Sequence, residues 1–363
     1  MILNIIVPCY LFTEIMNNIF IYSYIEILQC FLGCAVVVII GLLINILASG
    51  CLVKDKRQFK FLSCVFSTSD SSVFLLVLAQ ICGPIIDSIK PPKTGELTAD
   101  KRALKYIAII SIMNHIWKWA GCFYLIEGEN SDEIPVKEIE LKMLENKKHN
   151  NEESAKIEDY AHKEKAKNDT STKSHYNFPL YSIIFSLLLC LIPPLQNNFV
   201  DKSSFLNATI ISVNTVVGKS FNFCCIFLVG LFVCETMNWN SIKLRPYENQ
   251  FLSIIDIIWI SSLKLILMPL LCIPVILYLL NNIFNADICL LFVLFIFASS
   301  PFDMNLNIIC GIKNAFIETC SILNCVMIIC SIGTLILQVT LSVYVLGYYY
   351  EKQSIPVSQP IVA

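Results

Sequence analysis

Charged residues are scarce in this sequence. They make up 15% of its 363 residues, whereas a soluble domain carries roughly 25%, so much of the surface must face something other than water. The formal net charge of −2 gives no sign of the clustered basic face that nucleic-acid binding needs. Glycine and proline are too few for a collagen-like or low-complexity chain. These shortages exclude a nucleic-acid-binding protein and a fibrous one.

Several motifs of site chemistry are also missing. No Cys-x-x-Cys pair occurs among the 17 cysteines. All of them lie in or beside apolar stretches, which is typical of small packing residues and not of metal ligands or a disulfide framework. No Walker A motif is present, which disfavours direct ATP-driven pumping. The acidic residues inside the apolar stretches are not accompanied by a nucleophile–base pair or by the spacing of metal ligands. The sequence therefore predicts no enzyme, no metal site and no cofactor.

Long hydrophobic runs dominate what is there. Hydrophobic residues make up 56% of the chain, and the mean hydropathy is +0.68. A helix needs about 20 apolar residues to cross a bilayer core, and nine stretches meet this length without the alternation of membrane strands. The predicted spans are about 1–20, 25–53, 61–89, 103–126, 177–197, 204–237, 251–281, 286–312 and 319–348. The predicted fold class is therefore an all-α integral membrane protein in a lipid bilayer.

One long polar segment, 127–176, divides the chain. It holds nine lysines and thirteen acidic residues, too many charges to bury apolar surface, which predicts a solvated loop. It separates an N-terminal helical part, 1–126, from a C-terminal helical part, 177–348, which a tail, 349–363, follows. Outside the loop the two sides of the membrane have seven basic residues each. The loop therefore decides the predicted orientation, which places it in the cytosol.

Two of the apolar stretches contain a polar interruption, at 67–72 and at 299–307. Pro301 should open the second helix, because proline removes a backbone donor and clashes with the preceding turn. Irregular backbone inside a membrane survives only where it lines a cavity or is buried in protein, and such interruptions in both halves point to a transporter's binding site. The freed helix N-termini should face an anionic ligand. The predicted solute-binding residues are Ser69, Ser71, Ser72, Ser300, Pro301, Asn305 and Asn307.

Each interruption also carries an aspartate, Asp70 in the first and Asp303 in the second. An aspartate at the centre of a membrane helix costs about 2.5–3.5 kcal/mol on insertion scales. One interpretation is that the pair binds a proton or a cation and couples it to solute movement. The other is that each carboxylate only caps the N-terminus of a half-helix. The sequence leaves both open.

Three lysines lie well inside apolar stretches and away from their ends. Lys219 and Lys264 are candidate charge partners for the aspartates, although a lysine near a kinked helix end can also extend to the membrane surface. Lys118 lies between Trp117 and Trp119, a pattern typical of an anchor at the membrane interface.

Several segments carry a family resemblance. DICLLFVLFIFASSPFDMNLNIICGI at 287–312 is followed by ETCSILNC at 318–325. LNIIVPCYLFTEI stands at 3–15, LIPPLQNNF at 191–199 and SLKLILMPLLCIPVI at 262–276. Their order and spacing resemble the auxin efflux carrier family, in particular its PIN-LIKES branch.

The resemblance implies a fold of ten helices in two inverted repeats, with a broken helix in each repeat crossing near the membrane midplane. The first span here is similar to the family's second, so nine spans imply that the family's first helix is absent. The first interruption departs from the family's GN-x-GN-x-P pattern, because hydroxyl residues replace the asparagines and Phe74 stands in place of the proline. Lys264 stands where an arginine is usual.

The resemblance further implies a secondary transporter that moves a small organic anion by alternating access. Its expected location is the endoplasmic reticulum membrane, with the plasma membrane as the alternative. The expected partners are the solute, the bilayer and a second copy of the chain in a homodimer. A non-transporting receptor or sensor that keeps the fold is the competing hypothesis, and a flux assay in vesicles would separate the two.

Overall fold

The computed structural model of the chain describes residues 24–52, 56–70, 73–91, 97–126, 177–190, 254–313 and 315–354, with short pieces within 8–16 and 192–216 and residues 230 and 252. It separates a unit of residues 1–126 and 178–363 from a unit of residues 127–177. The predicted loop at 127–176 lies outside the described residues. All described helices belong to the first unit.

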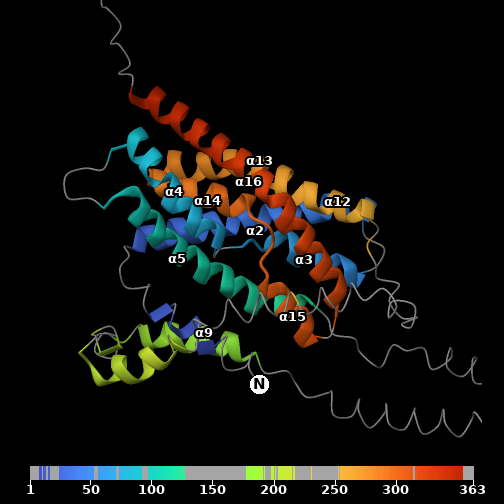
Figure 1. Cartoon of the computed structure of the whole chain (residues 1–363), viewed down its shortest axis with the longest axis horizontal. Coiled ribbons are helices and arrows are strands. Elements are labelled where there is room, and N and C mark those ends of the chain that lie inside the picture. Colours follow the sequence, from blue (N-terminus) through green and yellow to red (C-terminus); the bar gives the residue numbers. More distant parts are fainter. Residues whose placement is uncertain are drawn as a thin grey trace, which may run out of the picture. The chain divides into compact units, whose positions relative to one another are not determined.

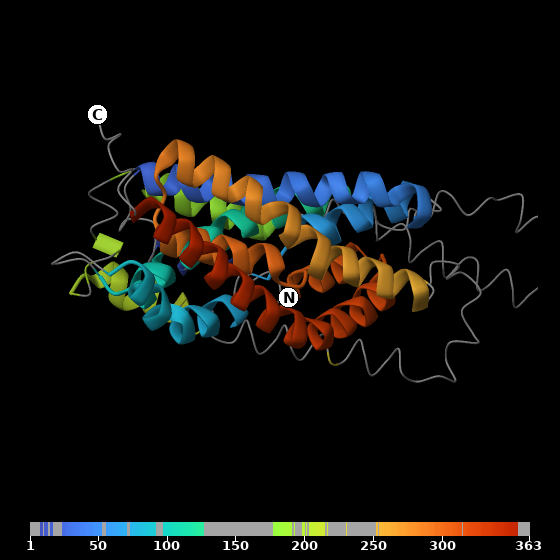
Figure 2. The same cartoon turned by 90° about the horizontal axis from the view of Figure 1, so that it is seen from above.

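The described elements are all helical, with no strand among them. Those of the N-terminal part are α2 (Tyr24–Leu52), α3 (Lys56–Ser67), α4 (Val73–Ile89), α5 (Ala99–Trp117), the π-helical turn η2 (Lys118–Cys122) and α6 (Phe123–Leu125). Those of the C-terminal part are α9 (Phe178–Cys190), η4 (Asn207–Ile211), α12 (Ile254–Ser262), η6 (Leu263–Leu267), α13 (Met268–Ile276), η7 (Leu277–Ile283), α14 (Ile288–Ser299), α15 (Asn305–Lys313) and α16 (Ile317–Ser354). Figures 1 and 2 show the long helices running in roughly the same direction.

Three described helices are long and apolar enough to cross a membrane: Tyr24–Gly50, Ile255–Ile283 and Ile317–Glu351. They match predicted spans at 25–53, 251–281 and 319–348. The predicted spans at 1–20 and 204–237 lie mostly outside the described residues, so the number nine and the inverted repeat stay predictions.

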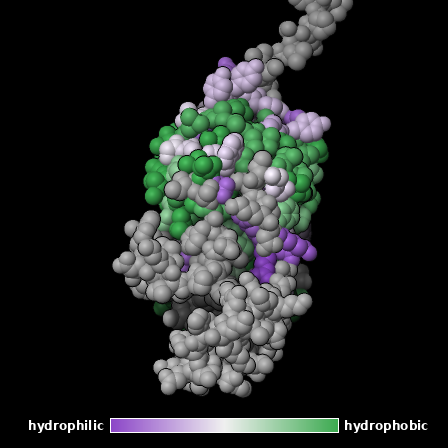
Figure 3. Space-filling view, turned by 90° about the vertical axis from the view of Figure 1, so that its right-hand side faces the viewer, coloured by the Kyte–Doolittle hydropathy of each residue, from purple (hydrophilic) through white to green (hydrophobic). Residues whose placement is uncertain are grey.

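The outer faces of these helices are apolar. Leu47 on α2 is 79% exposed, Ile329 on α16 is 70% exposed and Ile255 on α12 is 67% exposed. Figure 3 shows hydrophobic residues covering most of the described surface on the face that it displays. Water would penalise so continuous an apolar surface, so these faces are suited to lipid.

Helix α14 lies at the centre of the described unit. All its residues, Ile288 to Ser299, are at most 2% exposed, as expected for a helix that is apolar on every side. It packs against α2, α4, α5, α13 and α16 (Figure 1). Its C-terminal end therefore lies in the interior of the protein.

Both predicted interruptions are present. Helix α3 ends at Ser67 and α4 begins at Val73, while α14 ends at Ser299 and α15 begins at Asn305. Pro301 accounts for the second interruption. In the first, both the hydroxyl and the backbone N–H of Thr68 donate to the Cys64 carbonyl, over 2.8 Å and 3.1 Å, so a hydroxyl side chain bonds to the backbone at the end of α3.

Gly41 lets α2 approach the end of α3 closely. A Cβ atom added to Gly41 would lie 2.3 Å from the Phe66 carbonyl oxygen and 2.7 Å from its carbon. These are backbone atoms, which cannot rotate away as a side chain can. The position of the first interruption therefore depends on a glycine here.

Gly41→Ala is expected to displace the last turn of α3 and to lower the free energy of unfolding by roughly 1–3 kcal/mol, as overpacking does. Thermal unfolding of the purified protein in detergent measures the effect. Gly50→Ala is the matched control, because it lies in the same helix and a Cβ there meets nothing within 4 Å. Equal melting temperatures for the two variants would show that the close approach is unimportant.

Candidate functional site

The two interruptions contact each other directly. The backbone N–H of Asp70 donates to the carbonyl of Pro301 over 2.8 Å. A broken helix leaves backbone groups without their helical partners, and in a buried place these must be satisfied by protein. Each interruption thus completes part of the other's hydrogen bonding. We call residues Ser67–Asp70 and Ser299–Asp303 the polar junction.

The polar junction is buried although it is rich in polar groups. Thr68, Ser69, Ser299 and Ser300 are 0% exposed, and both aspartates are 3% exposed. Buried polar groups at this density occur where they are paired with one another or reserved for a ligand. The contacts of two buried lysines show how the charges are arranged.

Lys264 closes the first interruption. Its Nζ donates to the carbonyls of Phe66 and Thr68 over 2.9 Å and 2.6 Å and to the Ser69 hydroxyl over 3.0 Å. Carbonyls at the C-terminal end of a helix carry partial negative charge, which suits an ammonium group. The prediction that Lys264 pairs with an acidic residue needs correction, since its partners are the oxygens of α3 and the segment after it, together with the Met268 sulfur.

Lys118 closes the second interruption by an ion pair with Asp303. Its side chain is 0% exposed, so the prediction that it anchors the chain at the membrane interface is wrong. The tryptophans that suggested an interface also face the protein: Trp119 is 1% exposed, and the Trp117 indole donates to the Ser67 hydroxyl over 3.0 Å.

Both buried lysines lie in π-helical turns, Lys118 at the start of η2 and Lys264 within η6. A π-helical turn inserts an extra residue into the helical repeat, which rotates the following side chains relative to an ideal α-helix. Such turns are frequent at functional sites. No pattern in the sequence indicates them.

Asp303 has two sets of partners. One carboxylate oxygen accepts from the Asn305 backbone N–H over 2.7 Å, so the carboxylate caps the N-terminus of α15 as one of the two interpretations predicted. The other oxygen accepts from Lys118 and from the Asn114 side chain, the latter over 3.3 Å. Capping and ion pairing are thus both present in this one residue.

Asn114 joins the two interruptions and was missed by the sequence prediction. Its side-chain amide donates to the Ser69 carbonyl over 2.6 Å as well as to Asp303. The available signal was its spacing, because residues four apart on a helix share a face, and Asn114 precedes Lys118 by that interval.

The predicted solute-binding residues divide into three groups. Ser69, Ser300 and Pro301 lie in the polar junction, with Asn305 directly after it. Asn307 faces α16, where its side-chain oxygen accepts from Ser321 over 3.4 Å; its side-chain nitrogen is buried without a hydrogen-bond partner among the described residues. Ser71 and Ser72 lie outside the described part of the chain, as does Lys219, which was predicted as a charge partner.

Comparison with known proteins gives one match. A family model described as membrane transport protein matches residues 1–340, a range that includes both interruptions. No curated protein and no solved structure matches the chain.

Proposed function

This chain belongs to the membrane transport protein family, that of the auxin efflux carriers, and on that premise we propose that it moves a small organic anion across the membrane by alternating access. Family membership makes it a membrane transporter. The observation that carries the finer proposal is the hydrogen bond between Asp70 and Pro301, because it brings two interrupted helices to one buried polar place.

The second interruption already holds a built-in anion. The Asp303 carboxylate accepts a hydrogen bond at the N-terminus of α15 and also forms an ion pair with the ammonium group of Lys118. Both are preferred environments for negative charge. We propose that the acid group of the solute binds at this position when the Asp303 carboxylate moves away from Lys118. Ser69, Ser300 and Asn305, which belong to the two interruptions and the start of α15, would then contact the rest of the solute.

Charge balance supports a proton as the partner of the solute. Lys118, Lys264, Asp70 and Asp303 are all buried, so the ionised junction with its two lysines is electrically neutral. A monoanion would add an uncompensated charge in a medium of low dielectric constant, which is costly. A proton on Asp303 would restore neutrality and free Lys118 for the solute. His115, which is also buried, is a further titratable group on α5 close to Lys118.

The proposal retains the location that the resemblance implies and the orientation that the basic residues predict. We place the protein in the endoplasmic reticulum membrane, with the plasma membrane as the alternative, and segment 127–176 in the cytosol. We also propose that the protein forms a homodimer, as expected from the sequence.

Proteoliposomes with an imposed pH gradient test the proposal with a radiolabelled carboxylate such as indole-3-acetate. If one proton moves with each solute molecule, each unit of the pH gradient supplies about 1.36 kcal/mol to solute movement. The wild type should therefore accumulate the solute up to about tenfold per pH unit. Asp303→Asn, which cannot release a proton, should still equilibrate the solute but lose accumulation. Protein-free liposomes correct for passive entry of the neutral acid.

Asp201→Asn is the matched control, because this aspartate is exposed and lies outside the polar junction. It should accumulate solute as the wild type does. Equal accumulation by Asp303→Asn and the wild type would refute proton coupling at Asp303. Saturable binding without any flux would favour the receptor hypothesis over transport.

A further inference from the structure

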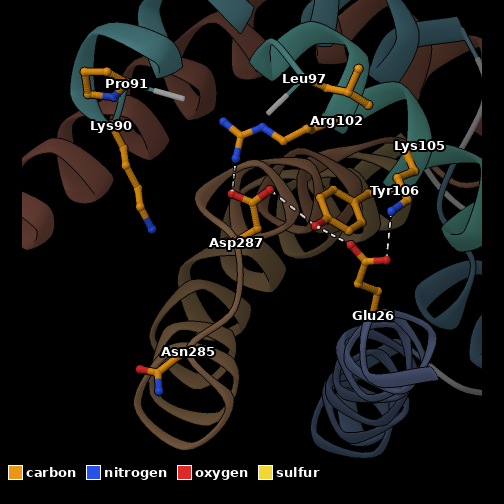
Figure 4. A pocket seen from close by; sticks show the side chains of 9 residues that line it. All are labelled: Glu26, Lys90, Pro91, Leu97, Arg102, Lys105, Tyr106, Asn285 and Asp287. Atoms are coloured by element: carbon orange, nitrogen blue, oxygen red, sulfur yellow. Dashed lines mark hydrogen bonds and ion pairs between the residues drawn. The ribbon is translucent and has the colours of Figure 1, made fainter. Parts of the chain in front are cut away.

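A polar cavity lies at the opposite end of α14 from the polar junction. Its volume is about 430 Å³, within the range of small-molecule sites. The start of α2, the end of α4, the start of α5 and the segment before α14 line it (Figure 4). Since α14 has 12 residues and a helix rises about 1.5 Å per residue, roughly 18 Å separate the cavity from the junction.

Two ion pairs form the back of the cavity. Lys105 contacts Glu26 over 2.8 Å, and Arg102 contacts Asp287 over 2.8 Å. The Tyr106 hydroxyl donates to Asp287 over 3.2 Å. These pairs join α2, α5 and the N-terminus of α14, so they hold the walls in place and neutralise four of the charges that line the cavity.

Lys90 is the basic residue of the lining that has no carboxylate partner among the described residues. It is an exposed residue at the end of α4 and forms no ion pair with any residue that the structure describes. Its ammonium group lies 4.9 Å from the centre of the Tyr350 ring, and Figure 4 shows the side chain extending along the cavity between Pro91 and Asn285. Asp87 does not line the cavity, but it contacts Arg102 over 3.6 Å, so its charge adds to that of the two carboxylates in the lining.

The remaining walls are partly apolar. Pro91 and Leu97 line the cavity, and Leu97 is 51% exposed. An apolar side chain exposed beside the Lys90 ammonium group offers complementary contacts to a molecule with an acid group at one end and an apolar body at the other.

We propose that this cavity binds an organic monoanion, with its acid group on Lys90 and its apolar body against Leu97 and Pro91. One ammonium group without a carboxylate partner matches one negative charge, whereas a dianion would remain half compensated. A soluble aromatic acid and the headgroup of an anionic phospholipid share this chemistry. The site goes beyond the proposed function, since its argument uses neither the polar junction nor transport.

Titration calorimetry of the full chain in phosphatidylcholine nanodiscs tests the site, with 1-naphthoate as the probe. Lys90→Gln should raise the Kd roughly tenfold or more, because it removes a charge-assisted hydrogen bond. Lys101→Gln is the matched control, as this exposed lysine on α5 is outside the lining, and its Kd should equal that of the wild type. The neutral 1-naphthamide should not distinguish the three proteins.

Nanodiscs that contain phosphatidylglycerol separate the two sources of the anion. If the lipid raises the apparent Kd of naphthoate for the wild type but not for Lys90→Gln, the cavity holds a lipid headgroup; if it does not, the cavity holds a soluble anion. The inference is overturned if naphthoate shows no saturable binding, or if Lys90→Gln and the wild type have the same Kd. The second result would place naphthoate at the polar junction and leave the proposed function intact.

Discussion

Lys264→Met is expected to abolish solute uptake and to lower the free energy of unfolding by roughly 1–3 kcal/mol for each buried acceptor that loses its donor. Methionine has a similar length but no donor. The carbonyls of Phe66 and Thr68 and the hydroxyl of Ser69 would lose the ammonium group that they share. Each buried acceptor left unsatisfied costs about 1–3 kcal/mol, so the first interruption should rearrange.

Uptake into proteoliposomes and thermal unfolding in detergent measure the two effects. Lys264→Arg keeps the positive charge and should retain more of both properties than the methionine variant. Lys56→Met, an exposed lysine at the start of α3, controls for the loss of a lysine as such. Wild-type uptake by Lys264→Met would mean that the oxygens of the first interruption do not need a cation.

Breaking the ion pair of the second interruption should have an effect of similar size. Lys118→Met leaves the Asp303 carboxylate buried without its ammonium partner, and we expect a loss of roughly 3–5 kcal/mol. Combining it with Asp303→Asn removes both charges. The double variant should be more stable than the sum of the single changes predicts, by up to about 3 kcal/mol for residues in direct contact.

Uptake separates stability from function in this cycle. If Lys118 holds the acid group of the solute, the double variant should fold but transport no anion. Additive losses of stability would show that the two side chains are not coupled. Full uptake by the double variant would remove Lys118 from the solute site.

The interruptions were predictable because their chemistry contrasts with their surroundings. Pro301 and the run of hydroxyl residues at 67–72 stand inside otherwise apolar stretches, and neither is compatible with a regular membrane helix in contact with lipid. Asp70 and Asp303 stand out in the sequence for the same reason. A local contrast in composition is enough to locate such places.

The partners of these residues were not predictable in the same way. Backbone oxygens carry no sequence signature, so the acceptors of Lys264 could not be named. Lys118 was misjudged because flanking tryptophans are typical of the membrane interface, whereas the direction of its side chain depends on the π-helical turn η2. The cavity around Lys90 involves the ends of helices that are distant in sequence, and only tertiary packing brings them together.

The oxygen cluster around Lys264 has a consequence for the energy source of the protein. Carbonyl and hydroxyl oxygens grouped in this way are the ligands that alkali metal ions use, and here an ammonium group permanently attached to the chain fills their centre. A sodium or potassium ion would have to displace a covalently tethered competitor. At this position the protein supplies its own counter-ion, whose presence does not depend on the salt composition of either compartment.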